Sequence, residues 1–247
     1  MKMHIGPSFL SGLVLSAMIA STAHASTINL SSGTLPTPDP NGGNYMLNYH
    51  GGTVTGVTST GYNFVFASAS AANATGASGA AGTVKLDSLV VADPSAPGPF
   101  LALDGDYDSS AVDVAVSTVA GKTYTVSFDW AGTQQTGFVY STTDMLQVAL
   151  GGDPVQDTAM ITVAQQGFNG WYDVTDTFTA STTGTEQLSF LDVATTVGHT
   201  SQEPAFALVD NISVSTPSAT PEPSSLMLLS TGLMGLGGFV RSRVKKS

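Results

Sequence analysis

Three aspartates in the segment "DGDYD" have a spacing that could bind a metal ion. Asp104, Asp106 and Asp108 stand at positions i, i+2 and i+4, so their carboxylates could converge on a hard cation such as Ca²⁺. An EF-hand loop would need glycine at its sixth position and glutamate at its twelfth, where this segment has Ser109 and Ala115. The segment is therefore either a calcium-binding loop of another kind or a solvated acidic turn.

A fourth aspartate stands within the pattern of a buried strand, "FALVDNISVS". Asp210 has the parity of Phe206, Leu208, Ile212 and Val214, so a regular strand would direct its carboxylate toward the core. An unpaired charge in the core is costly. A bulge in the strand, backbone N–H donors or a metal ion could each remove this cost, which makes Asp210 a candidate cation ligand.

The two tryptophans of the chain have polar side chains close to them in sequence. Aromatic rings stack on the C–H faces of sugars, while amides and hydroxyls bind the sugar hydroxyls. The candidate carbohydrate-binding residues are Trp130, Gln134, Trp171 and Tyr172. The alternative is that both tryptophans are buried in strands or turns.

Catalysis has little support in the sequence. The chain has no cysteine, and only His50 and His199 remain between residues 26 and 220. The serine nucleophile elbow, the His-Glu-x-x-His zinc motif and phosphate-binding loops are absent. A carboxylate pair could hydrolyse a glycoside, but some pair will be close by chance among so many acids. We predict no catalytic residues and a protein that is not an enzyme.

Alternation of apolar and polar residues indicates the elements that must position these side chains. In "KTYTVSFDWAG", the residues Tyr124, Val126, Phe128 and Trp130 share one parity, as in a strand with one face on a core. Similar runs recur between turns rich in Gly and Pro, and helix signals are scarce outside the termini. Residues 26–215 are therefore predicted to be one all-β domain, a two-sheet antiparallel jelly-roll sandwich. Residues 69–83 contain only small residues and are predicted to form a flexible surface loop.

The charge of this region restricts its partners. Residues 26–220 carry two lysines against 17 acidic side chains, which gives a net charge of −15. This charge repels phosphate backbones and attracts divalent cations, so nucleic acid is excluded as a partner. Solubility alone is the other explanation of the acidity. We expect no required cofactor, and a structural Ca²⁺ is the one candidate.

Both ends of the chain have features of targeting segments. Residues 1–25 read as a signal peptide in a helix, with Lys2, an apolar stretch and the small residues Ala23 and Ala25 before a cleavage site. An uncleaved membrane anchor is the alternative. Near the C-terminus, a linker (216–223) precedes an apolar segment (224–240) of 17 residues, predicted to be a transmembrane helix.

The last segment is basic and would determine the orientation. Residues 241–247 contain Arg241, Arg243, Lys245 and Lys246, which favour the cytoplasmic side of the membrane. The domain would then lie beyond the inner membrane.

The C-terminal features together resemble a known sorting signal. The tripeptide Pro221-Glu222-Pro223, the apolar segment and the terminal Arg-rich cluster resemble the PEP-CTERM signal of Gram-negative bacteria that make exopolysaccharide. The resemblance implies that a membrane-embedded exosortase recognises Pro221, Glu222 and Pro223, and that the protein is then released or attached at the cell surface. The two prolines keep the tripeptide extended. An ordinary membrane anchor behind a Pro-rich linker is the alternative.

The body resembles a galactose-binding-like jelly roll over about residues 98–215. The segments that carry this resemblance are "KTYTVSFDW", "GWYDVTDTFTA" and "LVDNISV". The resemblance implies a structural calcium near the closing strand, with Asp210 as a ligand.

These observations favour an exported, non-enzymatic protein of the cell surface or the extracellular polysaccharide matrix, with a structural or adhesive role. A carbohydrate-binding module with a defined glycan ligand is the alternative, and a carboxylate-dependent glycosidase is the third reading.

Overall fold

The structure, a computed structural model, describes residues 25–28, 44–46, 54–73, 84–87, 90–91, 93–95, 98–200 and 202–216. All of them lie in one compact unit, His24–Pro217. Several predicted segments fall outside the described residues: the signal peptide up to residue 24, the Pro-Glu-Pro linker, the transmembrane helix and the basic tail. Within the part of the chain that is described, no helix has the length and apolar character needed to cross a bilayer.

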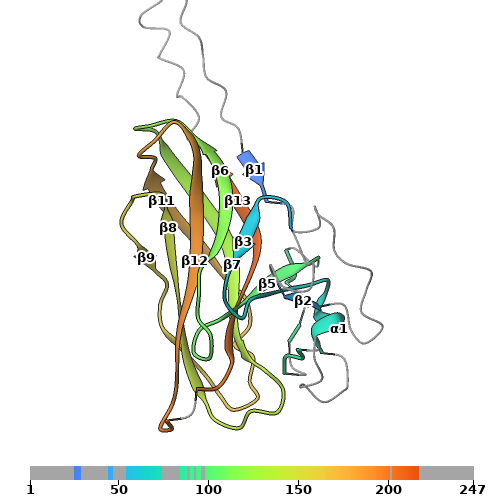
Figure 1. The fold of residues 1–247 in the computed structure, drawn as a ribbon. Coiled ribbons are helices and arrows are strands. Elements are labelled where there is room, and N and C mark those ends of the chain that lie inside the picture. The colour runs from blue at the N-terminus through green and yellow to red at the C-terminus, as the bar shows by residue number, and fades with distance from the viewer. Residues whose placement is uncertain are drawn as a thin grey trace, which may run out of the picture. The chain divides into compact units, whose positions relative to one another are not determined.

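The unit consists of two antiparallel sheets (Figure 1). Sheet 1 has the order β11-β7-β13-β5-β4-β2, with β1 also paired to β13. Its strands are β1 (Ala25–Thr27), β2 (Asn44–Met46), β4 (Phe64–Phe66), β5 (Phe100–Asp104), β7 (Thr123–Gln134), β11 (Tyr172–Thr179) and β13 (Ala205–Ser215). Sheet 2 has the order β10-β8-β12-β6-β3, with β9 also paired to β8. Its strands are β3 (Val57–Ser59), β6 (Val112–Thr118), β8 (Thr142–Leu150), β9 (Gln156–Asp157), β10 (Ile161–Val163) and β12 (Gly184–Thr196).

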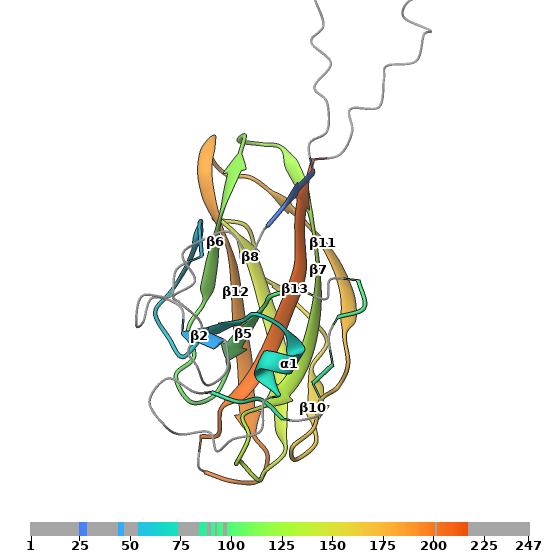
Figure 2. The same cartoon turned by 90° about the vertical axis from the view of Figure 1, so that its right-hand side faces the viewer.

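The predicted all-β jelly-roll sandwich is therefore confirmed. Long strands of both sheets run along the length of the unit, as the two views in Figures 1 and 2 show. The only helix among the described residues is α1 (Ala69–Ala72). The start of β1 pairs with the end of β13, where Ala25 lies opposite Ser215, so the two ends of the body are adjacent.

The main core lies between the sheets and is formed by the alternating residues. Tyr124, Val126, Phe128 and Trp130 of β7 are all buried there, as the alternation predicted. From sheet 2, strands β6, β8 and β12 contribute buried aliphatic residues and Phe190, whose ring meets that of Phe128 edge to face at 5.3 Å between centroids. Burial of this set of side chains is the main source of stability of the sandwich.

A second core covers the outer face of sheet 1. Phe64, Phe100 and Phe206 belong to it, and so do Ala69 and Ala72 of α1. Figure 2 shows α1 in front of strands β5 and β13. The prediction of a flexible surface loop at residues 69–83 is therefore wrong at its start. The small alanine side chains allow the helical turn to approach the sheet closely and become buried; residues 74–83 lie outside the described part.

The closing strand β13 contains an irregularity that changes which residues face the inter-sheet core. The register with β7 shifts between Asp210 and Ser213, and Asn211 has a left-handed φ of 50°. Phe206 and Leu208 belong to the outer core, while Ile212 and Val214 belong to the inner one. The expectation that these four residues share a face is wrong, because the bulge reverses the alternation. Asp210 consequently lies on the outer side of sheet 1.

Candidate functional site

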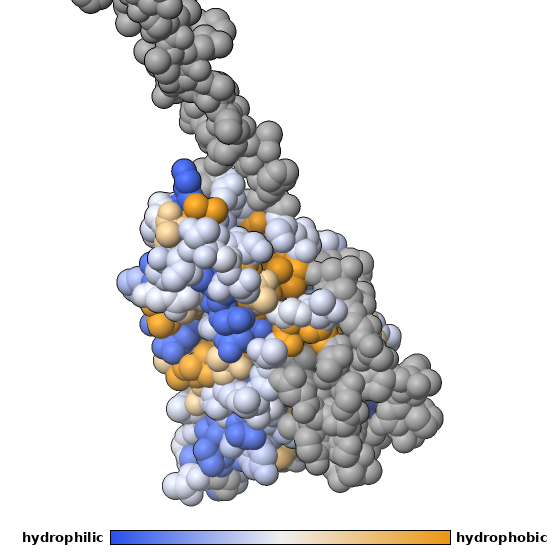
Figure 3. Space-filling view, turned by 45° about the horizontal axis from the view of Figure 1, so that its top comes forward, coloured by the Kyte–Doolittle hydropathy of each residue, from blue (hydrophilic) through white to orange (hydrophobic). Residues whose placement is uncertain are grey.

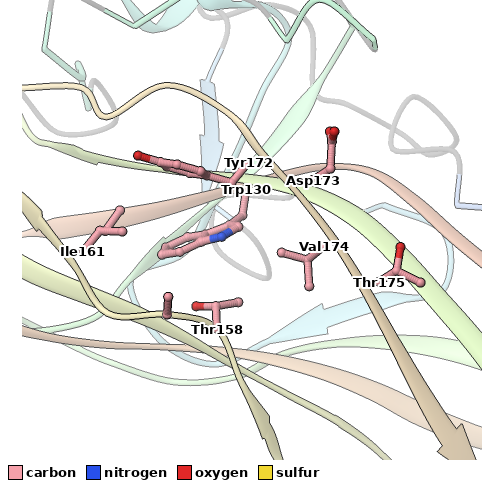
Figure 4. A pocket seen from close by; sticks show the side chains of 8 residues that line it. Trp130, Thr158, Ile161, Tyr172, Asp173, Val174 and Thr175 are labelled. Carbon is pink, nitrogen blue, oxygen red and sulfur yellow. The ribbon is translucent and has the colours of Figure 1, made fainter.

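A groove opens at one edge of the sandwich, where β11 of sheet 1 lies near β10 of sheet 2 (Figure 4). Its volume is about 380 Å³, which is at the small end of the range for ligand pockets. It is lined by Trp130, Thr158, Ala159, Ile161, Tyr172, Asp173, Val174 and Thr175. Two residues expected to bind carbohydrate, Trp130 and Tyr172, therefore meet in this groove.

The two aromatic rings have different roles in the groove. Tyr172 lies directly opposite Trp130 in the β11–β7 ladder, and the ring centroids are 6.1 Å apart with planes tilted by 41°. Trp130 is only 2% exposed and forms the floor, whereas Tyr172 is 43% exposed. Tyr172 is therefore the ring of this pair that can stack on a ligand.

The rest of the lining is mostly apolar. Ile161 and Val174 flank Trp130, while the carboxylate of Asp173 points away from it (Figure 4). The hydroxyl oxygen of Thr158 accepts the Leu146 N–H at 2.9 Å, which leaves the hydroxyl proton for another acceptor. The groove can therefore hold the apolar face of a sugar ring, but it has few polar groups that could hydrogen-bond the hydroxyls of that sugar.

The two other candidate ligand residues lie elsewhere and have structural partners. Gln134 is 1% exposed, donates to the Tyr140 carbonyl (2.7 Å) and to Thr142 Oγ1 (3.2 Å), and accepts from the Gln166 N–H (2.8 Å). Trp171 packs edge to face on Phe100 and donates from Nε1 to the Val91 carbonyl at 3.0 Å. Neither side chain is brought to the groove.

The carboxylates of "DGDYD" do not converge. Asp104 is buried and accepts the backbone N–H groups of Asp106, Tyr107 and Asp108. Asp106 Oδ2 accepts instead from the N–H (3.0 Å) and the hydroxyl (2.6 Å) of Thr196. The carboxylates of Asp104 and Asp106 thus have separate hydrogen-bond partners, and Asp104 is not a solvated residue of the turn. Burial raises the pKa of Asp104 to about 6, although the three N–H bonds oppose this shift.

Asp210 has carboxylate neighbours that the sequence did not indicate. It lies opposite Asp129 across the β13–β7 ladder, and Asp93 is close to both. Its Oδ1 accepts the Asn211 N–H at 2.7 Å, but its buried Oδ2 has no hydrogen-bond partner. Burial raises the pKa of Asp210 to about 7, and the charges of Asp93 and Asp129 add to the rise. Of the three explanations offered for this residue, the bulge and a backbone donor are both observed.

An acidic pair that the sequence reasoning missed lies between the sheets. Asp144 of β8 and Asp192 of β12 are both fully buried. Asp144 has the parity of Leu146, and Asp192 has the parity of Phe190, so the same alternation rule would have found both.

No group of three or more His, Cys, Asp or Glu side chains within the described ranges has an arrangement that could hold a metal ion. Neither the acidic pair nor the carboxylates around Asp210 therefore supply a complete set of cation ligands by themselves. Oxygen ligands of other kinds would be needed in either place.

Comparison with known proteins identifies the C-terminal segment. Residues 219–243 match the PEP-CTERM protein-sorting motif. The predicted recognition residues Pro221, Glu222 and Pro223, and the basic residues Arg241 and Arg243, all lie within this match. The resemblance of the tail to this sorting signal is thereby confirmed. No curated protein matches the chain.

Solved structures with a similar arrangement of strands include carbohydrate-binding modules at low sequence identity. TmCBM61 in complex with β-1,4-galactotriose has 14% identity, a TM-score of 0.35 and coverage of 65% of this chain and 90% of that one. The C-terminal family 22 module of Clostridium thermocellum Xyn10B has 15% identity, a TM-score of 0.35 and coverage of 75% and 99%. The CBM22-1 xylan-binding domain of Paenibacillus barcinonensis Xyn10C has 13% identity, a TM-score of 0.31 and coverage of 62% and 93%. Similarity at this level does not transfer a ligand.

Proposed function

We propose that this protein is exported, processed at its PEP-CTERM segment and delivered to the cell surface or the exopolysaccharide matrix, where it acts without catalysis as a structural or adhesive component. The observation that carries this proposal is the match of residues 219–243 to the sorting motif. The acidic, cysteine-free β-sandwich suits such a role, because its stability depends on core packing and not on disulfides.

The partner in this step is an exosortase-type enzyme at the inner membrane. Pro221 and Pro223 keep the tripeptide extended, so that Glu222 is presented to a recognition groove. The basic residues Arg241 and Arg243 follow the apolar segment and would hold the C-terminus in the cytoplasm. The folded body would then lie on the periplasmic side before its delivery.

The experiment compares Glu222→Ala with the neighbouring variant Thr220→Ala in the native host. We expect the wild type and Thr220→Ala to yield an exported product that has lost its C-terminal segment, as measured by intact mass. Glu222→Ala should accumulate in the membrane with its tail retained. An identical processed mass for Glu222→Ala would contradict recognition through this residue.

A second candidate function, glycan binding, is favoured by the groove beneath Tyr172. The outer face of sheet 2 is a poor alternative surface, because Phe190 is the one aromatic residue in the six strands of that sheet and it is buried. The face drawn in Figure 3 shows its apolar residues in separate patches between hydrophilic ones. The half-exposed Tyr172 ring above Trp130 offers a stacking surface for a sugar ring in the groove.

Glycan-array binding by the full-length protein, followed by titration of any ligand found, tests this function. We expect Tyr172→Ala to weaken binding about 5- to 30-fold, since stacking of one ring contributes on the order of 1–2 kcal/mol. The matched control is Tyr140→Ala, which removes a tyrosine that is 37% exposed and stacks on His199 instead. Equal loss in both variants, or no binding by the wild type, would contradict a glycan site in the groove.

We also propose that a structural cation binds near Asp210. Asp93 Oδ2 and Asp210 Oδ2 are buried without hydrogen-bond partners, and such oxygens are available to a hard cation. We expect a chelator to lower the Tm of the wild type more than that of Asp210→Asn.

A further inference from the structure

The acidic pair Asp144–Asp192 lies in the interior of the sandwich. In the β12–β8 ladder, Asp192 is opposite Leu146 and Ala194 is opposite Asp144, so the two aspartates are diagonal neighbours. Both have a relative exposure of 0%. Leu146 and Phe190, which share their face, belong to the inter-sheet core. The two carboxylates are thus enclosed in a region that is otherwise occupied by apolar side chains.

Each carboxylate has one oxygen with a protein donor and one without. Asp144 Oδ2 accepts from the Thr142 hydroxyl at 3.3 Å, and Asp192 Oδ2 accepts from the Ala207 N–H at 2.9 Å. Oδ1 of Asp144 and Oδ1 of Asp192 are buried and have no hydrogen-bond partner. Two fully buried carboxylates with unsatisfied oxygens would cost several kcal/mol in the absence of a positive partner.

The two lysines of the described residues lie in other parts of the unit. Lys85 donates from Nζ to the Ala71 carbonyl in the α1 region, at 3.2 Å. Lys122 precedes β7, whereas the hydrogen bond from Gln134 to Thr142 places the acidic pair at the other end of that strand. Further acids, Asp104 and Asp106, make the local potential more negative.

Gly132 of β7 and Gly105, the residue after the end of β5, lie where the carboxylates are. A Cβ added to Gly105 would come within 2.6 Å of Asp192 Cγ and Oδ2, and a Cβ on Gly132 would lie 3.5 Å from Asp144 Oδ2. Sheet 1 therefore presents bare backbone to the pair at both positions. Elsewhere in the inner core, the same sheet presents large side chains such as Phe128 and Trp130.

We propose that Asp144 and Asp192 together bind one Ca²⁺ ion between the two sheets, with the Thr142 hydroxyl beside it. Two carboxylates and one divalent cation form a neutral unit, which removes the cost of burying the charges. Hard oxygen donors of this kind are those that Ca²⁺ prefers. Since no third acidic or histidine side chain in the described part of the chain completes the arrangement, hydroxyl and backbone oxygens would supply the other ligands.

A proton is the competing occupant. Burial, reinforced by the mutual repulsion of the two carboxylates, raises the pKa of Asp192 well above its usual range, and burial raises that of Asp144 to about 7. Protons should therefore displace the cation in acid, and calcium binding should be stronger at pH 8 than at pH 6.

The test uses the purified full-length protein, stripped with a chelator and titrated with CaCl₂ at pH 8. We expect calorimetric binding and a rise in Tm of about 5–10 °C at a calcium concentration about 100 times the Kd. The double variant Asp144→Asn/Asp192→Asn should lose this rise. Its Tm in chelator should equal or exceed that of the stripped wild type, because the amides carry no buried charge. This comparison distinguishes loss of the site from loss of the fold.

Asp173→Asn is the matched control, because it removes an exposed carboxylate of β11 that belongs to neither acidic group. It should retain the calcium-dependent rise that depends on Asp144 and Asp192. The proposal is overturned if stripped wild type shows neither calcium binding nor a change in Tm. It is equally overturned if the double variant keeps the full response while Asp210→Asn loses it, since the cation would then lie at Asp210.

Discussion

The two buried acidic groups of this protein, one between the sheets and one on the outer side of sheet 1, differ in how their charges are satisfied. In the outer group, Ser95 donates its N–H to Asp93 at 2.8 Å, and its hydroxyl lies within hydrogen-bond distance of both Asp93 and Asp129. Asn211 donates its side-chain amide to Asp129 and its backbone N–H to Asp210. In the inner pair, the Thr142 hydroxyl donates to Asp144 alone and the backbone N–H groups of Ala207 and Met145 serve Asp192 alone, so no donor among the described residues bridges the two carboxylates.

The difference shows how neutral hydrogen-bond donors can stabilise buried carboxylates. The closing-strand bulge brings Asn211 to the outer group, and a loop brings Ser95, so several dipoles share the negative charge. In the regular ladder of β8 and β12 most backbone groups are used within the sheet, and among the described residues no side chain bridges the inner pair as Ser95 and Asn211 bridge the outer group. A positive charge, from a proton or a metal ion, is the remaining way to stabilise the inner pair.

The largest expected effect is the pH dependence of stability in the presence of a chelator. A raised folded-state pKa means that the folded protein holds the proton more tightly than the unfolded chain does. The stabilisation is therefore complete below the unfolded pKa of about 4 and is lost as pH rises through the folded value, about 7 for Asp144. Stability should therefore fall between pH 5 and pH 8, by on the order of a few kcal/mol for the coupled pair together.

Urea unfolding at the two pH values measures this fall. Asp144→Asn/Asp192→Asn should remove the part of the fall that the inner pair contributes and leave the parts of Asp104 and Asp210, whose pKa values are also raised. The exposed control Asp173→Asn should leave the whole fall unchanged. Equal stability of the wild type at pH 5 and pH 8 would show that the inner pair is not held protonated.

A smaller effect should come from filling the space against the inner pair. Gly105→Ala places a methyl group 2.6 Å from the Asp192 carboxylate, so we expect a loss of about 1–3 kcal/mol in the free energy of unfolding. Gly98→Ala is the matched control, because a Cβ there has nothing within 4 Å. Similar unfolding curves for the two variants would mean that the Asp192 carboxylate has room to move.

Removal of a neutral hydrogen-bond donor from the outer group should make its contribution to stability depend more strongly on pH, as expected for the inner pair. Ser95→Ala deletes the hydroxyl beside Asp93 and Asp129, and we expect a cost of about 1–2 kcal/mol at pH 8. The cost should shrink at pH 5, where a proton can replace the lost donor. A cost that is independent of pH would assign Ser95 a purely local role in its turn.

The smallest effect is expected for Asp210→Asn. This change removes a buried charge close to Asp93 and Asp129, so the free energy of unfolding should rise by about 1 kcal/mol at pH 8 in chelator. The gain is modest because Asn211 already supports one oxygen of the carboxylate. Destabilisation in chelator would indicate that the charge itself is needed.

The alternation of residues predicted the strands well, but not where the closing strand changes face. Tyr124 to Trp130 form the inner side of β7 as expected. In β13 the same rule failed, because Asn211 adopts a left-handed φ and the bulge reverses the alternation. The alanines of α1 were also misjudged, since small side chains bury area when the backbone lies close to a sheet.

Of the four residues predicted to bind carbohydrate, only Trp130 and Tyr172 lie in the groove. Trp130 and Tyr172 meet because the β7–β11 register places them opposite each other, a pairing of strands 42 residues apart that no local pattern encodes. Gln134 lies on the same inward face of β7 as Trp130, yet its amide groups are engaged by Tyr140, Thr142 and Gln166. The sequence shows which side chains have the chemistry to bind a sugar, but not whether their polar groups are already hydrogen-bonded within the protein.

The sequence by itself determined the sorting segment and the all-β character of the body. A linear motif and a period-two pattern are properties of neighbouring residues, so they need no knowledge of the fold. The tertiary structure alone decided which carboxylates meet, which of them keep an unsatisfied oxygen and which aromatic ring remains exposed. These properties depend on the distances between residues far apart in the chain and on the burial of each side chain. Both quantities strongly affect the free energy of a charged group.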